Sequence, residues 1–227
     1  STDIDPLITY LKSLAMPSKV EWSRKILQTK LDLLVIPTQD MKRIVKTIMQ
    51  GNYASFLELK IFTHYETIAL YGMLISELND FDEIKQYLDT YIDVMENWAH
   101  CDLLNFNIAT NDVAKFIALS EVYLQSDRVF IRRLGLFLLL CLIKKDLSIS
   151  YIMHTLASLS NETEYYVIMM AGWLLSECII RHQSETLSYL ESLEINPRIV
   201  NKGIQKCRES RRLTQSEKDA LLRYKRK

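Results

Sequence analysis

Apolar residues recur at spacings of three and four along nearly the whole chain, with polar residues between them. This period is typical of amphipathic α-helices, and the strict alternation of half-buried β-strands is lacking. The pattern therefore predicts an all-α protein whose helices are joined by short polar connections. The expected helices cover residues 3–14, 19–34, 38–50, 53–61, 63–78, 82–94, 97–109, 111–125, 128–145, 148–160, 162–181, 183–193, 197–210 and 214–226.

Polar residues that precede these segments indicate where several helices begin. Thr38, Asn97, Asn111 and Ser148 have the short hydrogen-bonding side chains that cap helix N-termini. The run Thr214-Gln215-Ser216-Glu217 matches a capping box, in which the side chains at its two ends each satisfy a backbone N–H. We expect the final helix to start there.

Two segments of the predicted helices, 128–145 and 163–181, are apolar nearly all round. A helix without a polar face must be covered on several sides by neighbours. A four-helix bundle has too few elements for this chain, whereas stacked helix pairs satisfy the requirement. We therefore predict an α-solenoid, a superhelix of antiparallel HEAT-like helix pairs with a concave face, forming a single domain over residues 1–227.

Composition adds that the chain has ample material for a core and an uneven distribution of charge. Hydrophobic residues make up 48% of the 227 residues, and the five glycines and four prolines leave no Gly-rich phosphate loop. The net charge is zero, yet residues 198–227 hold eleven Lys or Arg against three Asp or Glu. This local excess indicates an anionic partner such as nucleic acid, or else a solvated basic C-terminal segment.

The cysteine and histidine patterns indicate neither disulfides nor a metal site. No Cys-x-x-Cys or His-Glu-x-x-His motif occurs, so we expect free buried thiols in a reducing, cytoplasmic setting, with no metal and no organic cofactor. The polar start of the chain predicts no targeting signal. The longest apolar run, 134–143, is far shorter than the roughly 20 residues of a membrane span. The cysteines are Cys101, Cys141, Cys178 and Cys207.

Trp98 and Asp102 form the most informative pair of residues. Four residues correspond to about one helical turn, so the indole and the carboxylate should emerge on one face of a helix. An aromatic face attracts positive charge and a carboxylate stabilises it, which suits a cationic or electron-poor sugar. The alternative is a core tryptophan beside a surface aspartate.

Five segments in order resemble a known family. They are His64-Tyr65-Glu66-Thr67 with Tyr71-Gly72-Met73-Leu74-Ile75, then Asn97-Trp98-Ala99-His100-Cys101-Asp102, then Phe130-Ile131-Arg132-Arg133, then Tyr165-Tyr166-Val167 with Ala171-Gly172-Trp173-Leu174-Leu175-Ser176, and finally Asn201-Lys202-Gly203-Ile204-Gln205-Lys206-Cys207-Arg208-Glu209-Ser210. Together they resemble the DNA alkylation repair family, the AlkD-like DNA glycosylases built from HEAT-like repeats. The resemblance is strongest over residues 63–216.

The resemblance implies three catalytic residues and a set of DNA contacts. Trp98, Asp102 and Trp173 match the positions that face the damaged nucleotide in this family. One of Arg132 and Arg133 matches a phosphate-contacting arginine. Five cations lie on the predicted helix 197–210 or directly after it, and they are expected to bind the DNA backbone in the same way. The alternative is that they are ordinary solvated charges. The five cations are Lys202, Lys206, Arg208, Arg211 and Arg212.

The resemblance further implies a monomeric hydrolase, similar to 3-methyladenine and 7-methylguanine DNA glycosylases, that acts on N3- or N7-alkylated purines in double-stranded DNA. Two alternatives remain open. One is a non-catalytic DNA-structure-binding member of the family, because the net charge is zero and Ile168 and Ser176 stand where relatives carry polar or cationic side chains. The other is a HEAT-type protein–protein scaffold, which would have no affinity for DNA.

Overall fold

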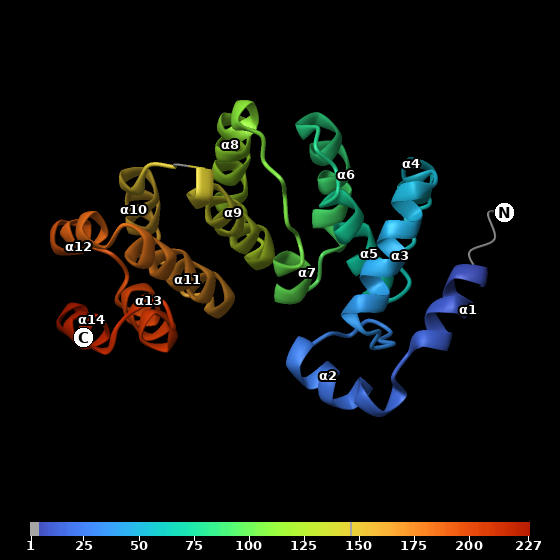
Figure 1. Cartoon of the computed structure of the whole chain (residues 1–227), viewed down its shortest axis with the longest axis horizontal. Coiled ribbons are helices and arrows are strands. Elements are labelled where there is room, and N and C mark those ends of the chain that lie inside the picture. Colours follow the sequence, from blue (N-terminus) through green and yellow to red (C-terminus); the bar gives the residue numbers. More distant parts are fainter. Residues whose placement is uncertain (1–4, 146) are drawn as a thin grey trace. The chain divides into compact units, whose positions relative to one another are not determined.

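The computed structural model describes residues 5–145 and 147–227, and within them the chain forms helices and no strand (Figure 1). A single isolated β-bridge joins Asp32 and His64. The prediction of an all-helical protein is thus confirmed. The chain divides into two compact units, Ser1–Ala109 and Thr110–Lys227, which are described separately below.

The N-terminal unit is centred on α5, which is buried on nearly every side. The unit contains α1 (Asp5–Leu14), a 3-10 turn η1 (Pro17–Lys19), α2 (Val20–Leu27), α3 (Thr38–Gln50), α4 (Tyr53–Glu58), α5 (Tyr65–Ile75), α6 (Phe81–Val94) and α7 (Trp98–Asp102). Helix α5 packs against α3, α6 and α7. Leu70, Leu74 and Ile75 of α5 are completely shielded from solvent. The expected start of the first helix at residue 3 lies outside the described residues.

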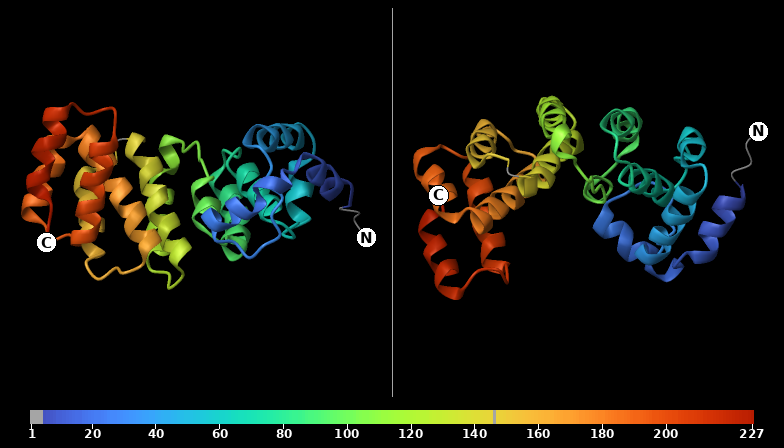
Figure 2. Two further views of the ribbon diagram at one scale, coloured as in Figure 1. Left: turned by 90° about the horizontal axis from the view of Figure 1, so that it is seen from below. Right: turned by 45° about the horizontal axis from the view of Figure 1, so that its top comes forward.

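The C-terminal unit is built around two apolar helices, α9 and α11. It contains η2 (Thr110–Asp112), α8 (Val113–Leu124), α9 (Val129–Leu142), η3 (Ile143–Lys145), α10 (Ile149–Ser158), α11 (Tyr165–Arg181), α12 (Gln183–Ser192), α13 (Pro197–Glu209), α14 (Gln215–Ala220) and η4 (Leu221–Tyr224). Helix α9 packs between α8 and α11, and α11 also contacts α10, α12 and α13. Figure 2 shows α8, α9, α11 and α13 side by side in this unit. The prediction that both apolar helices are covered by neighbours is confirmed.

Two glycines allow α11 and α13 to approach closely. A Cβ atom on Gly172 would lie 2.7 Å from Cβ of Lys202, and one on Gly203 would lie 2.8 Å from Cδ2 of Leu175. Neither distance is compatible with an unstrained side chain, so each glycine removes an atom that would otherwise separate the two helices. This packing fixes the side chains of α13 relative to those of α11.

Three helices end six or seven residues earlier than the hydrophobic pattern predicts. The helix expected over 19–34 ends at Leu27, and Gln28 adopts a left-handed conformation with φ 52°. The helix expected over 97–109 ends at Asp102, and the backbone N–H of Asn105 donates to Ser76 Oγ instead. The last helix breaks after Ala220, and Arg226 donates to the carbonyls of residues 190, 193 and 195.

Three of the predicted helix caps are confirmed and two are wrong. Asn97, Ser148 and Thr214 each accept a hydrogen bond from a backbone N–H of the helix that follows, and Thr214 forms the capping box with Glu217. Thr38 already lies inside α3, which Pro37 precedes as the cap residue. Asn111 lies in the η2 turn, because this turn delays the start of α8 to Val113.

Candidate nucleic-acid interface and Trp–Asp site

Helix α7 is a single turn that carries Trp98 as its first residue and Asp102 as its last. Asn97 starts the turn, since its Oδ1 accepts the backbone N–H of His100 at 3.0 Å. Both Trp98 and Asp102 are half-buried, and Cys101 between them is fully buried. The structure therefore places the indole and the carboxylate at the two ends of one helical turn.

Contacts with the C-terminal end of α2 hold α7 in place. The indole Nε1 of Trp98 donates to the carbonyl of Ile26 at 3.4 Å, and Nδ2 of Asn97 donates to the carbonyl of Leu27 at 3.1 Å. The Glu96 carboxylate accepts the hydroxyl of Thr29, and it also accepts the backbone N–H of Lys30 at 3.0 Å. The Trp98 indole and the Asn97 amide thus satisfy two carbonyls at the C-terminal end of α2, where a helix leaves its carbonyl groups without an internal partner. The position of the Trp–Asp turn thus depends on residues about 70 positions earlier in the sequence.

His100 connects the opposite side of α7 to α5 through contacts with Tyr65. The backbone N–H of Glu96 donates to Nδ1 of His100 at 3.2 Å, while Nε2 lies 3.1 Å from the carbonyl oxygen of Tyr65. The imidazole stacks on the Tyr65 ring with centroids 4.2 Å apart. Burial lowers the pKa of His100 to about 4, despite the opposing effect of the Tyr65 carbonyl and of Glu96. With this pKa the imidazole is neutral at pH 7, and both of its nitrogens are engaged by backbone groups.

Trp173 lies on α11 in the C-terminal unit and is half-buried. The ammonium nitrogen of Lys206 is 6.0 Å from the centroid of its ring, the outer limit of a cation–π contact. The carbonyl of Trp173 accepts the hydroxyl of Ser176 at 2.7 Å. Because Trp98 and Asp102 belong to one unit and Trp173 to the other, the convergence of all three residues stays a prediction.

Arg132 and Arg133 of α9 are both engaged inside the protein. Nε and Nη2 of Arg132 donate to the two carboxylate oxygens of Glu162 at 2.9 and 3.2 Å, and Nη1 donates to the carbonyl of Ser126. Burial raises the pKa of Glu162, but hydrogen bonds from Arg132 and from backbone N–H groups outweigh this effect and lower it. Arg133 is 6% exposed and donates to the carbonyl of Tyr166 at 2.7 Å. Their role in binding phosphate stays a prediction.

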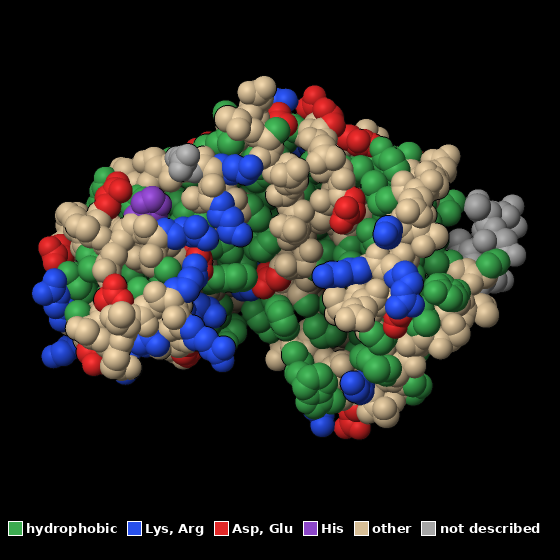
Figure 3. Space-filling model, in the orientation of Figure 1, with side chains coloured by type: hydrophobic (Ala, Val, Ile, Leu, Met, Phe, Trp, Pro, Cys, Tyr) green, Lys and Arg blue, Asp and Glu red, His purple; other side chains and the backbone are tan. Residues whose placement is uncertain are grey.

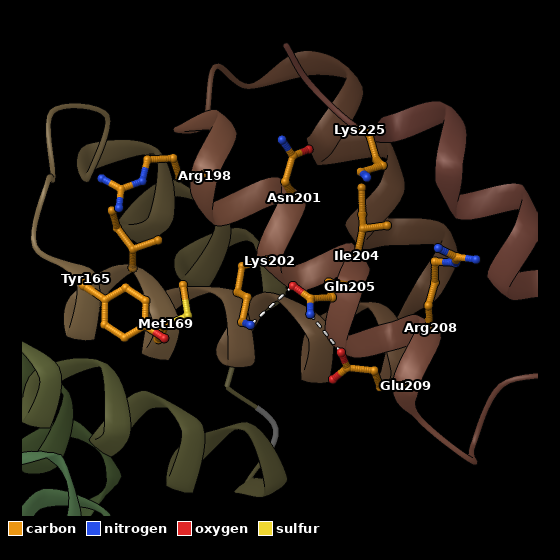
Figure 4. A pocket seen from close by; sticks show the side chains of 11 residues that line it. Tyr165, Met169, Arg198, Asn201, Lys202, Ile204, Gln205, Arg208, Glu209 and Lys225 are labelled. Carbon is orange, nitrogen blue, oxygen red and sulfur yellow. Dashed lines mark hydrogen bonds between the residues drawn. The ribbon is translucent and has the colours of Figure 1, made fainter. Parts of the chain in front are cut away.

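A basic groove of about 710 Å³ runs between α11 and α13, with part of its wall from the chain end (Figure 4). Its cationic lining side chains are Arg198, Lys202, Arg208 and Lys225, against one acid, Glu209. The acid is engaged with a neighbour, since Nε2 of Gln205 donates to it at 2.9 Å. The groove therefore presents a net positive charge, and Lys and Arg side chains gather over this part of the C-terminal unit in Figure 3.

Two of the predicted DNA-binding residues, Lys202 and Arg208, line this groove. Lys206 lies on the same helix but faces the Trp173 ring, and Arg211 is exposed in the turn after α13. Arg212 instead forms an ion pair with Glu177. Arg198 and Lys225 also line the groove, although no motif identified them. Both residues lie within 198–227, and the excess of positive charge over that range is the sequence feature that could have indicated them.

The part of the chain that the structure describes contains neither a cluster of metal ligands nor a membrane-spanning helix. No group of three or more His, Cys, Asp or Glu side chains is placed to hold a metal ion there. No helix in the same residues combines the length and apolar character that crossing a bilayer requires. The four cysteines, all within the described residues, form no disulfide; three of them are buried and Cys141 is partly exposed.

Comparison with known proteins identifies one family. The family model described as DNA alkylation repair enzyme matches residues 7–214 of the 227-residue chain. Among curated proteins, none matches the chain. The matched range contains α7 and α11, as well as α13 with most of the basic groove. The chain belongs to the DNA alkylation repair enzyme family.

Proposed function

We propose that this protein is a DNA glycosylase that hydrolyses the N-glycosidic bond of cationic N3- or N7-alkylated purines in duplex DNA. Membership of the DNA alkylation repair enzyme family supports a role in DNA repair. The observation that carries the finer proposal is the fixed turn of α7, which holds Trp98 and Asp102 on one short helix. Its contacts with α2 and α5 supply the rigid support that a catalytic carboxylate needs.

The chemistry requires few catalytic groups, because alkylation has already made the purine a cationic leaving group. As the C1′–N bond breaks, its electron pair neutralises the purine and the sugar acquires oxocarbenium character. Asp102 stabilises this charge and orients the water whose oxygen bonds to C1′, and it accepts the proton that the water loses. Trp98 and Trp173 pack on the deoxyribose, where their π-faces favour the developing positive charge.

We further propose that the helices form a HEAT-like superhelix whose concave face receives the duplex. The order of the elements in the C-terminal unit supports this, since α8 and α9, α10 and α11, and α12 and α13 follow one another as helix pairs. The contacts of α9 with α11 and of α11 with α13 make these second helices one continuous layer. Such a layer suits an extended, anionic partner.

Phosphate contacts are assigned first to α13 and the turn that follows it. Lys202 and Arg208 line the basic groove, and Lys206 and Arg211 extend the same positive segment. A contact from Arg132 or Arg133 would require the guanidinium to leave Glu162 or the Tyr166 carbonyl. Removing an ionised group from a buried partner is costly, so these two arginines are weaker candidates.

The decisive experiment is the release of 7-methylguanine or 3-methyladenine from methylated duplex DNA. We expect Asp102→Asn to lower the rate at least about tenfold, which corresponds to about 1.4 kcal/mol of transition-state stabilisation, while duplex binding is retained. Asp82→Asn, which changes an exposed acid on α6, is the matched control. Equal rates for the Asp102 variant and the wild type would remove this residue from the mechanism.

A second candidate is a DNA-structure-binding protein without catalytic activity. The zero net charge and the internal pairing of the α9 arginines favour it. It predicts salt-dependent binding of bent or branched DNA by the wild type with no release of base. A protein–protein scaffold, in contrast, would show no affinity for DNA even at low salt.

A further inference from the structure

The N-terminal unit contains a trough of about 680 Å³ that the proposed catalytic and DNA-binding residues do not line. Its walls come from α3, from the C-terminal half of α5 and from the residues that follow α7. Its lining includes the cations Lys42 and Lys46, the acid Glu77, and the apolar side chains of Met49, Met73 and Leu103. Lys and Arg side chains also lie over α3 in Figure 3.

The two lysines lie one helical turn apart on α3, and both are exposed. They flank the buried side of the helix, since Val45, which is buried, lines the same trough. Among the residues that the structure describes, neither ammonium has a carboxylate partner within 4.0 Å. Both positive charges are therefore available to a ligand.

Two other exposed lysines of the same unit, Lys25 and Lys85, are compensated by acids. Lys25 forms an ion pair with Glu21 at 3.2 Å, and Lys85 forms one with Asp89 at 2.6 Å. Each pair joins residues four positions apart on one helix, the usual arrangement on a solvated face. The lysines of the trough differ from them in having apolar walls beside them, which reduce local screening and strengthen the attraction of an anion.

The trough also leads to the proposed catalytic turn. Leu103, which lines it, directly follows Asp102. A neighbouring apolar cavity of about 360 Å³ shares Lys42, Met73 and Leu103 with the trough and continues to Leu27 and Tyr65, which contact Asn97 and His100 respectively. An anion that is bound along α3 would thus extend toward α7. A polyanionic strand fits this continuity better than a small isolated anion does.

We infer that Lys42 and Lys46 bind successive phosphates of the DNA strand that passes α7, with Met73 and Leu103 packing on the deoxyribose between them. This inference rests on the proposed function and adds a second phosphate-binding segment to the one on α13. Contacts of this kind position the duplex without reading its sequence. The N-terminal unit would then hold the strand on which Asp102 acts.

The test is the salt dependence of duplex binding by the full-length protein. Each phosphate contact contributes about −0.9 to the slope of log K against log salt concentration, so the K42Q/K46Q variant should reduce the steepness of this slope by about 2. K25Q/K85Q, which removes two compensated lysines, should leave the slope unchanged. K42R/K46R should retain the wild-type slope, because it preserves both charges. If the glutamine variant fails to fold, K42M/K46M tests the same loss of charge.

The results separate this inference from the proposed function. A slope for K42Q/K46Q equal to that of the wild type would overturn the inference, even where the wild type releases base. A wild type that binds no duplex at low salt would overturn both. Reduced slopes for both K42Q/K46Q and K202Q/K206Q, with the control unchanged, would support two separate segments of contact.

Discussion

Protonation of His100 should destabilise the N-terminal unit. Burial lowers the pKa of His100 in the folded protein to about 4, from an ordinary value of 6.5. Because the pKa is depressed by folding, the neutral imidazole contributes stability that is fully present above pH 6.5. This contribution is lost as the pH falls from 6.5 to about 4. A shift of this size corresponds to about 3–4 kcal/mol at about 1.4 kcal/mol per pKa unit.

Urea unfolding at several pH values between 7.5 and 4 measures this effect. The probe is the fluorescence of Trp98 in a Trp22→Phe/Trp173→Phe background, so that only the N-terminal unit is followed. The free energy of unfolding should fall progressively below pH 6.5. In His100→Asn the stability at pH 7.5 should be lower, and its dependence on pH in this range should be weaker.

The pH dependence of stability that arises from other titratable groups can be distinguished from that of His100. Burial raises the pKa of Glu66 despite backbone hydrogen bonds from Leu34 and Val35, so its contribution is lost as pH rises through that pKa, opposite in sign to that of His100. His154→Asn alters an exposed histidine of α10 and should reproduce the wild-type profile. A constant difference in stability between wild type and His100→Asn from pH 7.5 to 4 would refute the reasoning.

Three further predictions concern packing and ion pairing. Gly203→Ala places a methyl group 2.8 Å from Leu175. The overpacking should cost about 1–3 kcal/mol of unfolding free energy, more than the roughly 1 kcal/mol gained in helix propensity. A melting temperature equal to or above the wild-type value would contradict this prediction. Asn97→Ala should cost about 1–2 kcal/mol in urea unfolding, more than the same change at the Asn52 cap, because it also deprives the Leu27 carbonyl of its donor. Glu162→Gln should lower the unfolding free energy of the C-terminal unit by about 2 kcal/mol or more, because it leaves the Arg132 guanidinium, only 15% exposed, without its carboxylate. Unchanged thermal unfolding would argue against a stabilising role of the Arg132–Glu162 ion pair.

Local features of the fold were predictable from the sequence, and contacts between distant residues were not. Three N-cap residues each cap a helix that begins at the next residue, so the local sequence is sufficient to predict them. They are Asn97, Ser148 and Thr214. The end of α2 at Leu27 has no such pattern. Glu96 accepts the N–H of Lys30, and Glu66 accepts the N–H groups of residues 34 and 35, so acids from later in the sequence engage the non-helical segment after α2.

The same distinction applies to the candidate site. The spacing of Trp98 and Asp102 predicts their placement on one helical turn, because that relation is local. The support of this turn by the α2 carbonyls required the folded structure. Lys42 and Lys46 resemble any exposed pair in a helix. The trough beside them and the ion pairs of Lys25 and Lys85, which distinguish the two sets, are features of the folded structure.

The anchoring of α7 on α2 makes the segment ahead of α3 indispensable to the proposed catalytic centre. A truncated protein starting at Thr38 would retain every residue proposed for catalysis. It would, however, lack the acceptors of the Trp98 indole and the Asn97 amide, and Glu96 would lose the Thr29 hydroxyl. Substitutions in the first 37 residues that touch no substrate should therefore appear as losses of activity in a mutational scan.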